Sequence, residues 1–339
     1  MKTKTKDCGL RKYIFLGLMC FAFFAARAQY ETIVDVSNCP DAAVEQAIEQ
    51  NGTKLLTEFN NAQGEKRNLS LSGINIAKDA ASSLLTMWEV CPFRCDELEI
   101  IESCLRRNDG GYQVRNIPVI MEPRAGERFE EDKYQEIVLN YDAQGAIADV
   151  CFTISSAQYK QIMRSNLEVT DLRRRSLVID FVEQFRTAYN RKDMAFLEDI
   201  FSDDALIITG KTIQRKPVDG IAMPPEVVLT SQTKREYLTK LAGVFKRNQR
   251  INVVFEDVKV STHRSKTNIY GVKLIQHWNA DTYSDKGYLF LLWDFADETH
   301  PQIHVRAWQP FESTPKDKVL GLGSFKNSRL TWERECLSG

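Results

Sequence analysis

The chain has 339 residues, of which 43% are apolar and 27% are charged, and its formal net charge is −1. This length suits two ordinary domains, and the composition is typical of a globular protein. There is no basic excess and no acidic tail, so the sequence lacks the charge pattern of a nucleic-acid-binding protein or of a solvating segment.

The N-terminal segment has the layout of a secretory signal peptide. Basic residues at positions 2–12 precede an apolar run at 13–26, and Ala26-Arg27-Ala28 matches the cleavage rule. The apolar run is shorter than the ~20 residues that a membrane-spanning helix needs. We therefore predict that residues 1–28 are removed and that the mature chain begins at Gln29. The protein would be exported to the periplasm or the extracellular space, without a membrane span.

Six cysteines would remain in the exported chain: Cys39, Cys91, Cys95, Cys104, Cys151 and Cys336. An even number permits disulfides, which would concentrate in the first half, and their pairing is left open. The spacing of these cysteines is not a standard zinc pattern, and no histidine precedes His263, so we predict neither a metal site nor a cofactor. Cys20, within the signal, raises a lipoprotein alternative that the preceding Leu18-Met19 disfavours.

Apolar periodicity predicts two helices and then four strands in the first half. The helices are expected at 41–60 and 78–90. The strands are expected in two hairpins, at 97–105 with 112–121 and at 134–141 with 146–154, because Asn108-Asp-Gly-Gly and Asp142-Ala-Gln-Gly145 are turn sequences. A short helix at 155–164 follows. The first domain, residues 29–165, is thus expected to be helices followed by a four-strand meander.

The second half shows a different order of elements. Helices are expected at 177–190, 194–201 and 234–247, a short strand at 205–209, and an irregular segment at 211–230. Strands follow at 251–260, 268–278, 288–295 and 303–308, and a slip in the alternation near Glu256 predicts a β-bulge. Residues 288–295 are apolar on both faces, which predicts a strand in the centre of a sheet. Residues 312–339 read as a loosely attached tail.

This order of elements carries a family resemblance. The stretches FVEQFRTAYNRKDMAFLEDIFSDDALIITG, GYLFLLWDF and HVRAWQP resemble the nuclear transport factor 2-like superfamily, in its SnoaL-like branch, over residues 175–311. The resemblance implies a curved sheet wrapped around helices, forming a cone whose mouth holds a small molecule. The superfamily includes isomerases, dehydratases, epoxide hydrolases, transport adaptors and dimerisation modules, so the fold does not give the activity.

The expected fold class is therefore α+β with two domains, each of helices packed on an antiparallel sheet. The second domain spans residues 166–311 and is the cone. Whether the first domain is a diverged copy of the second stays open, and a cystatin-like α+β domain fits it equally well.

Asp294 and His304 are the candidate catalytic residues. If Phe295 lies opposite Ile303 in an antiparallel hairpin, Asp294 lies beside His304 on one face, where the two could act as a general acid–base pair. The alternative is a structural ion pair at the end of the sheet, or a polar patch in an interface. The candidate ligand-binding residues are Tyr189, Trp278, Trp293, Arg306 and Trp308.

Two functions from different classes fit these observations. The first is an exported, non-catalytic protein that binds a small ligand or a protein partner through the cone pocket or the sheet face. The alternative is a small-molecule lyase, isomerase or hydrolase that uses Asp294 and His304 in the cone pocket. Because residues 288–295 are apolar on both faces, one face is expected to meet either the first domain or a second subunit, as in a homodimer.

Overall fold

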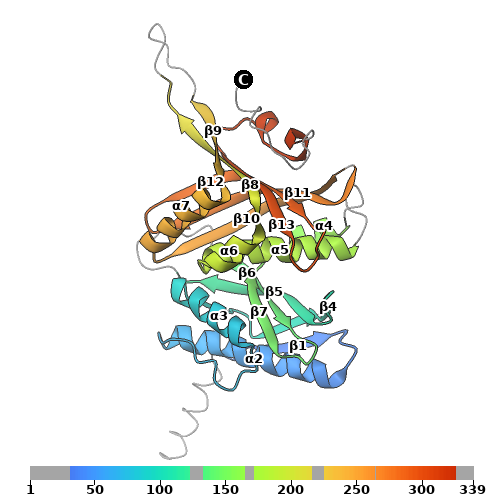
Figure 1. The fold of residues 1–339 in the computed structure, drawn as a ribbon. Coiled ribbons are helices and arrows are strands. Elements are labelled where there is room, and N and C mark those ends of the chain that lie inside the picture. The colour runs from blue at the N-terminus through green and yellow to red at the C-terminus, as the bar shows by residue number, and fades with distance from the viewer. Residues whose placement is uncertain (1–30, 123–132, 165–171, 216–224, 264, 326–339) are drawn as a thin grey trace, which may run out of the picture.

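The computed structural model describes residues 31–122, 133–164, 172–215, 225–263 and 265–325. It has an α+β fold in which two halves, each of helices and a largely antiparallel sheet, lie one above the other (Figure 1). The predicted signal peptide and Cys336 lie outside the described residues. Within the described ranges, no helix is long and apolar enough to cross a membrane.

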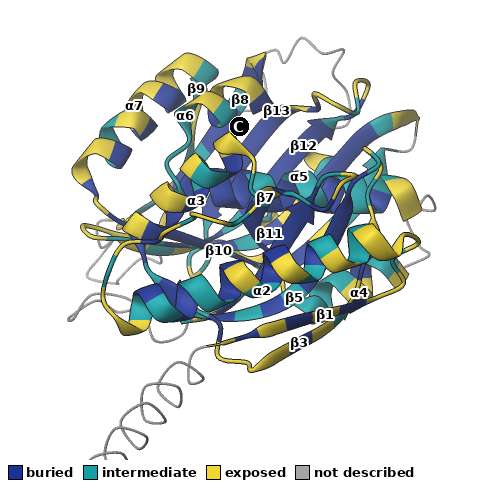
Figure 2. Cartoon of the chain, turned by 90° about the horizontal axis from the view of Figure 1, so that it is seen from below, coloured by how far each residue is buried: buried dark blue, intermediate teal, exposed yellow. Residues whose placement is uncertain are grey.

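The first half is a twisted meander with two helices on one face. Its elements are β1 (Ile33–Ser37), α2 (Ala42–Gly64), α3 (Lys78–Val90), β2 (Phe93–Arg94), β3 (Glu99–Ser103), β4 (Leu105–Arg106), β5 (Tyr112–Met121), β6 (Tyr134–Tyr141) and β7 (Ile147–Phe152). The meander has the order β2-β5-β6-β7. Leu55 and Phe59 from α2 and Trp88 from α3 pack against its apolar face, while the opposite side of α2 is exposed (Figure 2).

The pairing of β3 differs from the sequence prediction. β3 pairs in parallel with β1, a strand that the prediction does not contain, and Val34 lies opposite Ile100. The expected hairpin around Asp109 is reduced to β4, where Leu105 and Arg106 pair with the start of β5. A five-residue strand such as β1 is too short for its alternation to stand out in the sequence.

The second half is a six-stranded sheet that curls around helices, in the order β10-β11-β12-β13-β8-β9 (Figure 1). Its elements, with the preceding α4, are α4 (Ser156–Arg164), α5 (Leu172–Asn190), α6 (Met194–Ile200), β8 (Phe201–Ile213), β9 (Glu226–Thr233), α7 (Lys234–Arg247), β10 (Ile251–His263), β11 (Lys266–Ala280), β12 (Ser284–Asp294) and β13 (Gln302–Pro310). β12 is internal in the sheet, as predicted. The sequence pattern predicted an irregular segment at 211–230. The structure instead has the strand β9 over the last part of that segment.

Two local predictions in this half are confirmed. The side chain of Thr233 accepts a hydrogen bond from the amide of Glu236, and the Glu236 carboxylate accepts one from the amide of Thr233, which forms the capping box of α7. The register of β10 shifts between Glu256 and Lys259, which marks a β-bulge, and Asp257 there has a φ of 48°, a left-handed conformation found in one type of β-bulge.

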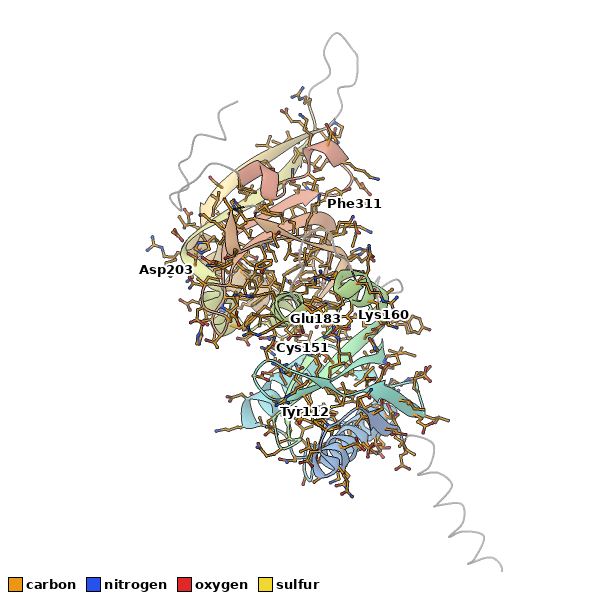
Figure 3. All side chains as sticks on the ribbon, turned by 90° about the vertical axis from the view of Figure 1, so that its right-hand side faces the viewer. Tyr112, Cys151, Lys160, Glu183, Asp203 and Phe311 are labelled. Carbon is orange, nitrogen blue, oxygen red and sulfur yellow. The ribbon has the colours of Figure 1, made fainter. Side chains whose placement is uncertain are left out.

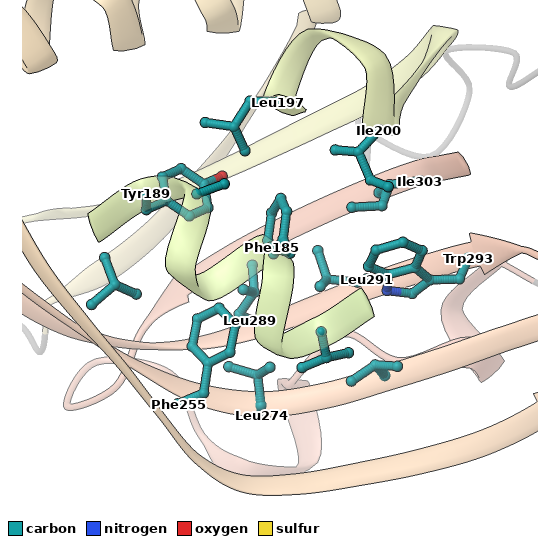
Figure 4. Close-up of a cluster of buried hydrophobic side chains, with 14 of the residues drawn as sticks. Phe185, Tyr189, Leu197, Ile200, Phe255, Leu274, Leu289, Leu291, Trp293 and Ile303 are labelled. Atoms are coloured by element: carbon teal, nitrogen blue, oxygen red, sulfur yellow. The ribbon is translucent and has the colours of Figure 1, made fainter. Parts of the chain in front are cut away.

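Both faces of β12 are covered, but by different parts of the chain. Leu289, Leu291 and Trp293 point inward to the core shared with α5 and α6 (Figure 4). On the outer face, Phe290 stacks on Phe325, with ring centroids 5.4 Å apart. The cover of this outer face is therefore the C-terminal segment, residues 316–325, with the 3₁₀ helices η2 (Lys316–Lys318) and η3 (Leu322–Phe325).

This arrangement corrects two expectations. The sequence prediction assigned the outer cover to the first domain or a second subunit and took residues 312–339 as a loosely attached tail. Leu320 and Leu322 of that tail instead pack on the sheet with Phe325. The side-chain amide of Gln309 accepts a hydrogen bond from the backbone N–H of Leu320 and donates one to the backbone carbonyl of Lys318. Three apolar residues spread over six positions follow neither a helix nor a strand period throughout, so their common face could not be predicted from the sequence pattern.

The helix α5 joins the two halves. Val178, Val182 and Phe185 pack on the core of the second half. The opposite side of α5 faces the polar side of the first-half meander, and Glu183 lies at this junction (Figure 3). α5 is therefore buried on both sides, between the sheets of the two halves.

Buried charges in this junction have close partners. Arg115 of β5 donates to both carboxylate oxygens of Glu183, at 3.0 and 2.5 Å, and the amide of Ile154 donates to Glu183 at 3.0 Å. Arg186 donates to the carbonyls of Val253 and Thr153 and to the side chain of Gln135. This set of side chains, which we call the junction network, holds the two halves together through directed bonds.

Candidate functional site

The hairpin of β12 and β13 has a register different from the predicted one. Trp293 lies opposite Ile303 and Leu292 opposite Val305, so His304 is the extra residue of a bulge. The expected pairing of Phe295 with Ile303 is therefore wrong by two residues. Asp294 Oδ2 nevertheless lies 3.8 Å from His304 Nε2. That distance suits a weak ion pair and exceeds a hydrogen bond.

Asp294 and His304 lie on the outer face of the sheet. Asp294 is opposite Ile269, whose side chain belongs to the outer apolar cluster under the C-terminal segment. His304 Nδ1 is 3.5 Å from the carboxylate of Asp204 on β8. Asp294 also borders a surface hollow of about 400 Å³ beside residues 265–269. The catalytic hypothesis required the pair to lie inside the cone. The pair lies outside it.

Four of the five candidate ligand-binding residues meet inside the cone, and the fifth does not. Tyr189 from α5 packs edge-on against Trp278 of β11, with centroids 5.7 Å apart, and Arg306 and Trp308 extend from β13 to the same side. Trp293 is fully buried between Phe185 and Phe295, at 6.2 and 5.8 Å. Figure 4 shows Tyr189 and Trp293 at opposite ends of this core.

Three of these residues, Tyr189, Arg306 and Trp308, belong to a larger polar group on the inner side of the sheet. We call it the inner polar cluster, and it consists of Tyr189, Tyr237, Gln276, Asp285, Arg306 and Trp308. The hydroxyls of Tyr189 and Tyr237 are 2.7 Å apart. The Arg306 guanidinium lies 5.0 Å from the ring centroid of Tyr237. This contact is a cation–π interaction.

Gly287 makes the close approach within this cluster possible. Gly287 lies between Gln276 on β11 and Pro310 on β13, two residue pairs away from the pair that contains Trp308. A Cβ at Gly287 would lie 2.3 Å from the Trp308 ring, so the indole occupies the space of the missing side chain. The glycine thus lets Trp308 lie across β12.

Four buried polar atoms of the cluster have no hydrogen-bond partner in the described part of the chain. Two are donors, Arg306 Nε and Trp308 Nε1, and two are acceptors, Gln276 Oε1 and Asp285 Oδ1. Arg306 is 6% exposed and Gln276 is 3% exposed. Buried polar atoms almost always have a partner, because leaving one unpaired costs free energy. Each of these atoms therefore calls for a bound water or a ligand group.

Burial changes the protonation chemistry of the cluster. It raises the pKa of Tyr189 well above its ordinary value, and the neighbouring Tyr237 raises it further. Burial also raises the pKa of Asp285, although Tyr283 and Arg306 favour its ionised form. The cluster thus combines a permanent cation with the neutral hydroxyl of Tyr189 and a carboxylate whose charge is disfavoured.

Sequence reasoning missed three members of this cluster. Tyr237 and Gln276 lie within the predicted helix at 234–247 and the predicted strand at 268–278, and Asp285 lies between two predicted strands, but none of the three was a candidate site residue. Gln276 carries the one usable signal, because it is polar within the alternating apolar row Tyr270, Val272, Leu274 and Trp278. Among the described residues, no group of three or more His, Cys, Asp or Glu side chains could hold a metal ion.

No protein-family model and no curated protein matches this sequence. Solved structures match about half of the chain or less. An NTF2-like protein from Cytophaga hutchinsonii is 15% identical, with a TM-score of 0.30, over 40% of this chain and 98% of that one. A Streptomyces avermitilis protein named as a dehydratase of the NTF2-like family is 13% identical, with a TM-score of 0.30, over 40% of this chain and 94% of that one.

A third match, Bd1075 from Bdellovibrio bacteriovorus, is 14% identical with a TM-score of 0.31. It involves 49% of this chain and 47% of that protein, so the chain spans about half of its length. These likenesses concern the fold alone. Each of the two NTF2-like proteins matches over 40% of this chain.

Proposed function

We propose that this is an exported protein that binds a small polar molecule on the inner polar cluster of its second half. The observation that carries the proposal is the group of four buried polar atoms without partners, on Gln276, Asp285, Arg306 and Trp308. The export rests on the signal-peptide layout of residues 1–28.

The unpaired atoms define the chemistry of the ligand. Arg306 Nε and Trp308 Nε1 require an acceptor such as a carbonyl or carboxylate oxygen, while Gln276 Oε1 and Asp285 Oδ1 require a donor such as a hydroxyl or amine. The rings of Tyr237 and Trp278 favour an apolar or planar body between these groups. A small hydroxy- or amino-carbonyl compound meets all of these requirements.

The same chemistry favours binding over acid–base catalysis. Arg306 stays protonated in proteins, and the raised pKa of Tyr189 keeps its hydroxyl neutral near pH 7, so neither side chain is a general base. The Asp294–His304 pair, on which the enzymatic alternative depended, faces the other side of the sheet. We therefore assign no catalytic role to that pair.

A thermal-shift screen tests this proposal. The panel contains small hydroxy acids, amino acids and their carbonyl analogues, applied to the wild type, Arg306→Gln, Trp308→Phe and a control variant, Arg94→Gln. Arg94 is a surface residue of the first half that pairs with Asp96. We expect at least one compound to raise the Tm of the wild type and of Arg94→Gln, and not of the two cluster variants. Equal stabilisation of Arg306→Gln, or no compound with a Kd below about 1 mM, would contradict the proposal.

A further inference from the structure

The cysteines of the first half fall into two kinds by their surroundings. The thiol of Cys151 contacts the carboxylate of Asp149 at 3.0 Å, that of Cys95 the carbonyl of Glu97 at 4.0 Å, and that of Cys91 the carbonyl of Pro92 at 3.7 Å. Each of these contacts is to an oxygen. The Cys39 thiol also contacts an oxygen, the carbonyl of Asp41 at 3.5 Å, but Cys39 and Cys104 differ from the other three because their thiols lie beside each other.

The strands β1 and β3 bring these two cysteines together. Ser37 and Ser103 are paired at the ends of the two parallel strands, and the amide of Cys104 donates to the carbonyl of Ser37 at 2.8 Å. Asn38 then turns the chain, with a φ of 64°, and its side chain donates to Ser103 Oγ at 3.3 Å. Cys39 thus directly follows Asn38, whose side chain is hydrogen-bonded to Ser103, the residue before Cys104.

The environment of the two thiols agrees with this placement. Cys39 packs against the apolar core cluster of the first half, to which Cys104 belongs. Burial raises the pKa of Cys104 to about 12, and the neighbouring Cys39 thiol contributes to the increase. Both residues are reduced thiols in this structure, Cys104 buried and Cys39 partly accessible.

We propose that Cys39 and Cys104 form a disulfide once the protein reaches an oxidising compartment. The oxidant is a disulfide, either a small molecule such as oxidised glutathione or a protein. The Cys39 thiolate, which is the accessible one, attacks a sulfur of the oxidant, forms a mixed disulfide and releases one thiolate. The Cys104 thiolate then attacks the Cys39 sulfur and releases the second. Two protons leave the cysteines, and the oxidant takes up the two electrons.

The bond would fasten the ends of β1 and β3 to each other. β1 and β3 form a two-stranded sheet of their own, separate from the meander. A crosslink between residues 39 and 104 encloses α2, α3, β2 and β3 in one covalent loop. Closing a long loop restricts the unfolded chain, so the oxidised protein should melt at a higher temperature than the reduced one.

Peptide mapping of the full chain tests this pairing. The purified protein is incubated with oxidised glutathione, its free thiols are alkylated, and it is digested without reductant. We expect a peptide pair that links Cys39 to Cys104, lighter by two hydrogen atoms than the sum of the two reduced peptides. Cys91, Cys95 and Cys151 should be recovered alkylated.

Serine variants provide the controls. Cys39→Ser and Cys104→Ser should each abolish the linked peptide and the dependence of Tm on dithiothreitol, whereas Cys95→Ser should keep both. Because Cys39 is partly exposed, its variant should fold even if the Cys104 variant does not. Alkylation of both cysteines after oxidation, or a linkage of either one to another cysteine, would overturn the proposal.

Discussion

The junction network and the inner polar cluster are both buried and polar, but they differ in pairing. In the junction network, Glu183 accepts from Arg115 through both oxygens and from the amide of Ile154. Arg186 has three acceptors. Arg115 and Arg306 each keep an unpaired Nε. Arg115 is paired with the carboxylate of Glu183, whereas the guanidinium of Arg306 in the inner polar cluster faces tyrosine rings and forms no ion pair with a carboxylate of the described residues.

The difference separates two uses of buried polarity. A buried charge with a matched partner keeps two elements in one register, whereas a buried charge without one costs stability that nothing in the fold recovers. The junction network therefore reads as the device that holds the halves together. The inner polar cluster reads as a site whose remaining partners come from a ligand. Mutations in the two regions should accordingly have different consequences.

The largest effect is expected from Arg115→Met in the junction network. The change leaves the carboxylate of Glu183 buried without its cation, and burial already raises the pKa of Glu183 while Arg115 opposes that increase. Losing one partner of a buried pair typically costs about 3–5 kcal/mol of unfolding free energy. Urea denaturation measures the loss. The double variant Arg115→Met/Glu183→Met should recover part of it, and a double variant less stable than the single one would refute this role.

A smaller effect is expected on the outer face. His304→Ala removes a side chain that is 11% exposed and lies 3.8 and 3.5 Å from the carboxylates of Asp294 and Asp204. We expect a loss of about 1 kcal/mol. Ligand binding to the inner polar cluster should be unchanged, because the two sites lie on opposite faces of the sheet. Calorimetry measures ligand binding by His304→Ala and Asp294→Asn. Loss of binding by either variant would show that these residues take part in the ligand site.

Arg306→Gln should cost less stability than Arg115→Met and abolish ligand binding. The variant gives up a cation–π contact with Tyr237 and also relieves the burial of an incompletely paired charge. These two effects oppose each other, so the net change in unfolding free energy should stay within about 1 kcal/mol. Denaturation of both variants in the same urea series gives the comparison. A loss as large as that of Arg115→Met would show that Arg306 serves the fold.

The smallest effect is expected from Asp285→Asn, and it should be stabilising. Burial raises the pKa of Asp285 above its ordinary value of 3.8. The folded state then binds the proton more tightly than the unfolded state, so this contribution is fully present below pH 3.8 and is lost as the pH rises through the raised pKa. An asparagine does not ionise, so Asp285→Asn does not lose stability in this way as the pH rises. Its advantage over the wild type, followed by Tm against pH, should be absent below pH 3.8 and grow above it. A variant that is less stable at neutral pH would contradict this reading.

Local sequence patterns were enough to predict most helices and the central position of β12. They also predicted the β-bulge near Glu256, because a single slip in alternation is visible in the residues themselves. The polar side of α5 illustrates the limit. Asp180, Glu183 and Thr187 recur at helical spacing and read as a solvent-facing stripe, yet α5 is buried on that side by the first half. Sequence periodicity cannot distinguish solvent from a polar protein surface.

The candidate site was predictable in part for a related reason. Tyr189, Trp278, Arg306 and Trp308 could be chosen from their residue types and their strands. The pairing of Asp294 with His304 could not be placed, because one bulge at His304 changes the register and a strand pattern does not reveal which face is concave. Gln276 and Asp285 join the cluster through pairing across strands, which a single strand does not encode.

The most direct test of the central claim uses the indole N–H signals of Trp308 and Trp88 in ¹H–¹⁵N spectra. Trp308 Nε1 is an unpaired donor of the inner polar cluster, and Trp88 lies in the core of the first half, where no ligand is expected. On addition of a compound that raises the Tm of the wild type, the Trp308 signal should shift as its N–H gains an acceptor, and the Trp88 signal should stay in place. A bound compound that leaves the Trp308 signal unmoved would contradict the assignment of this cluster as the ligand site.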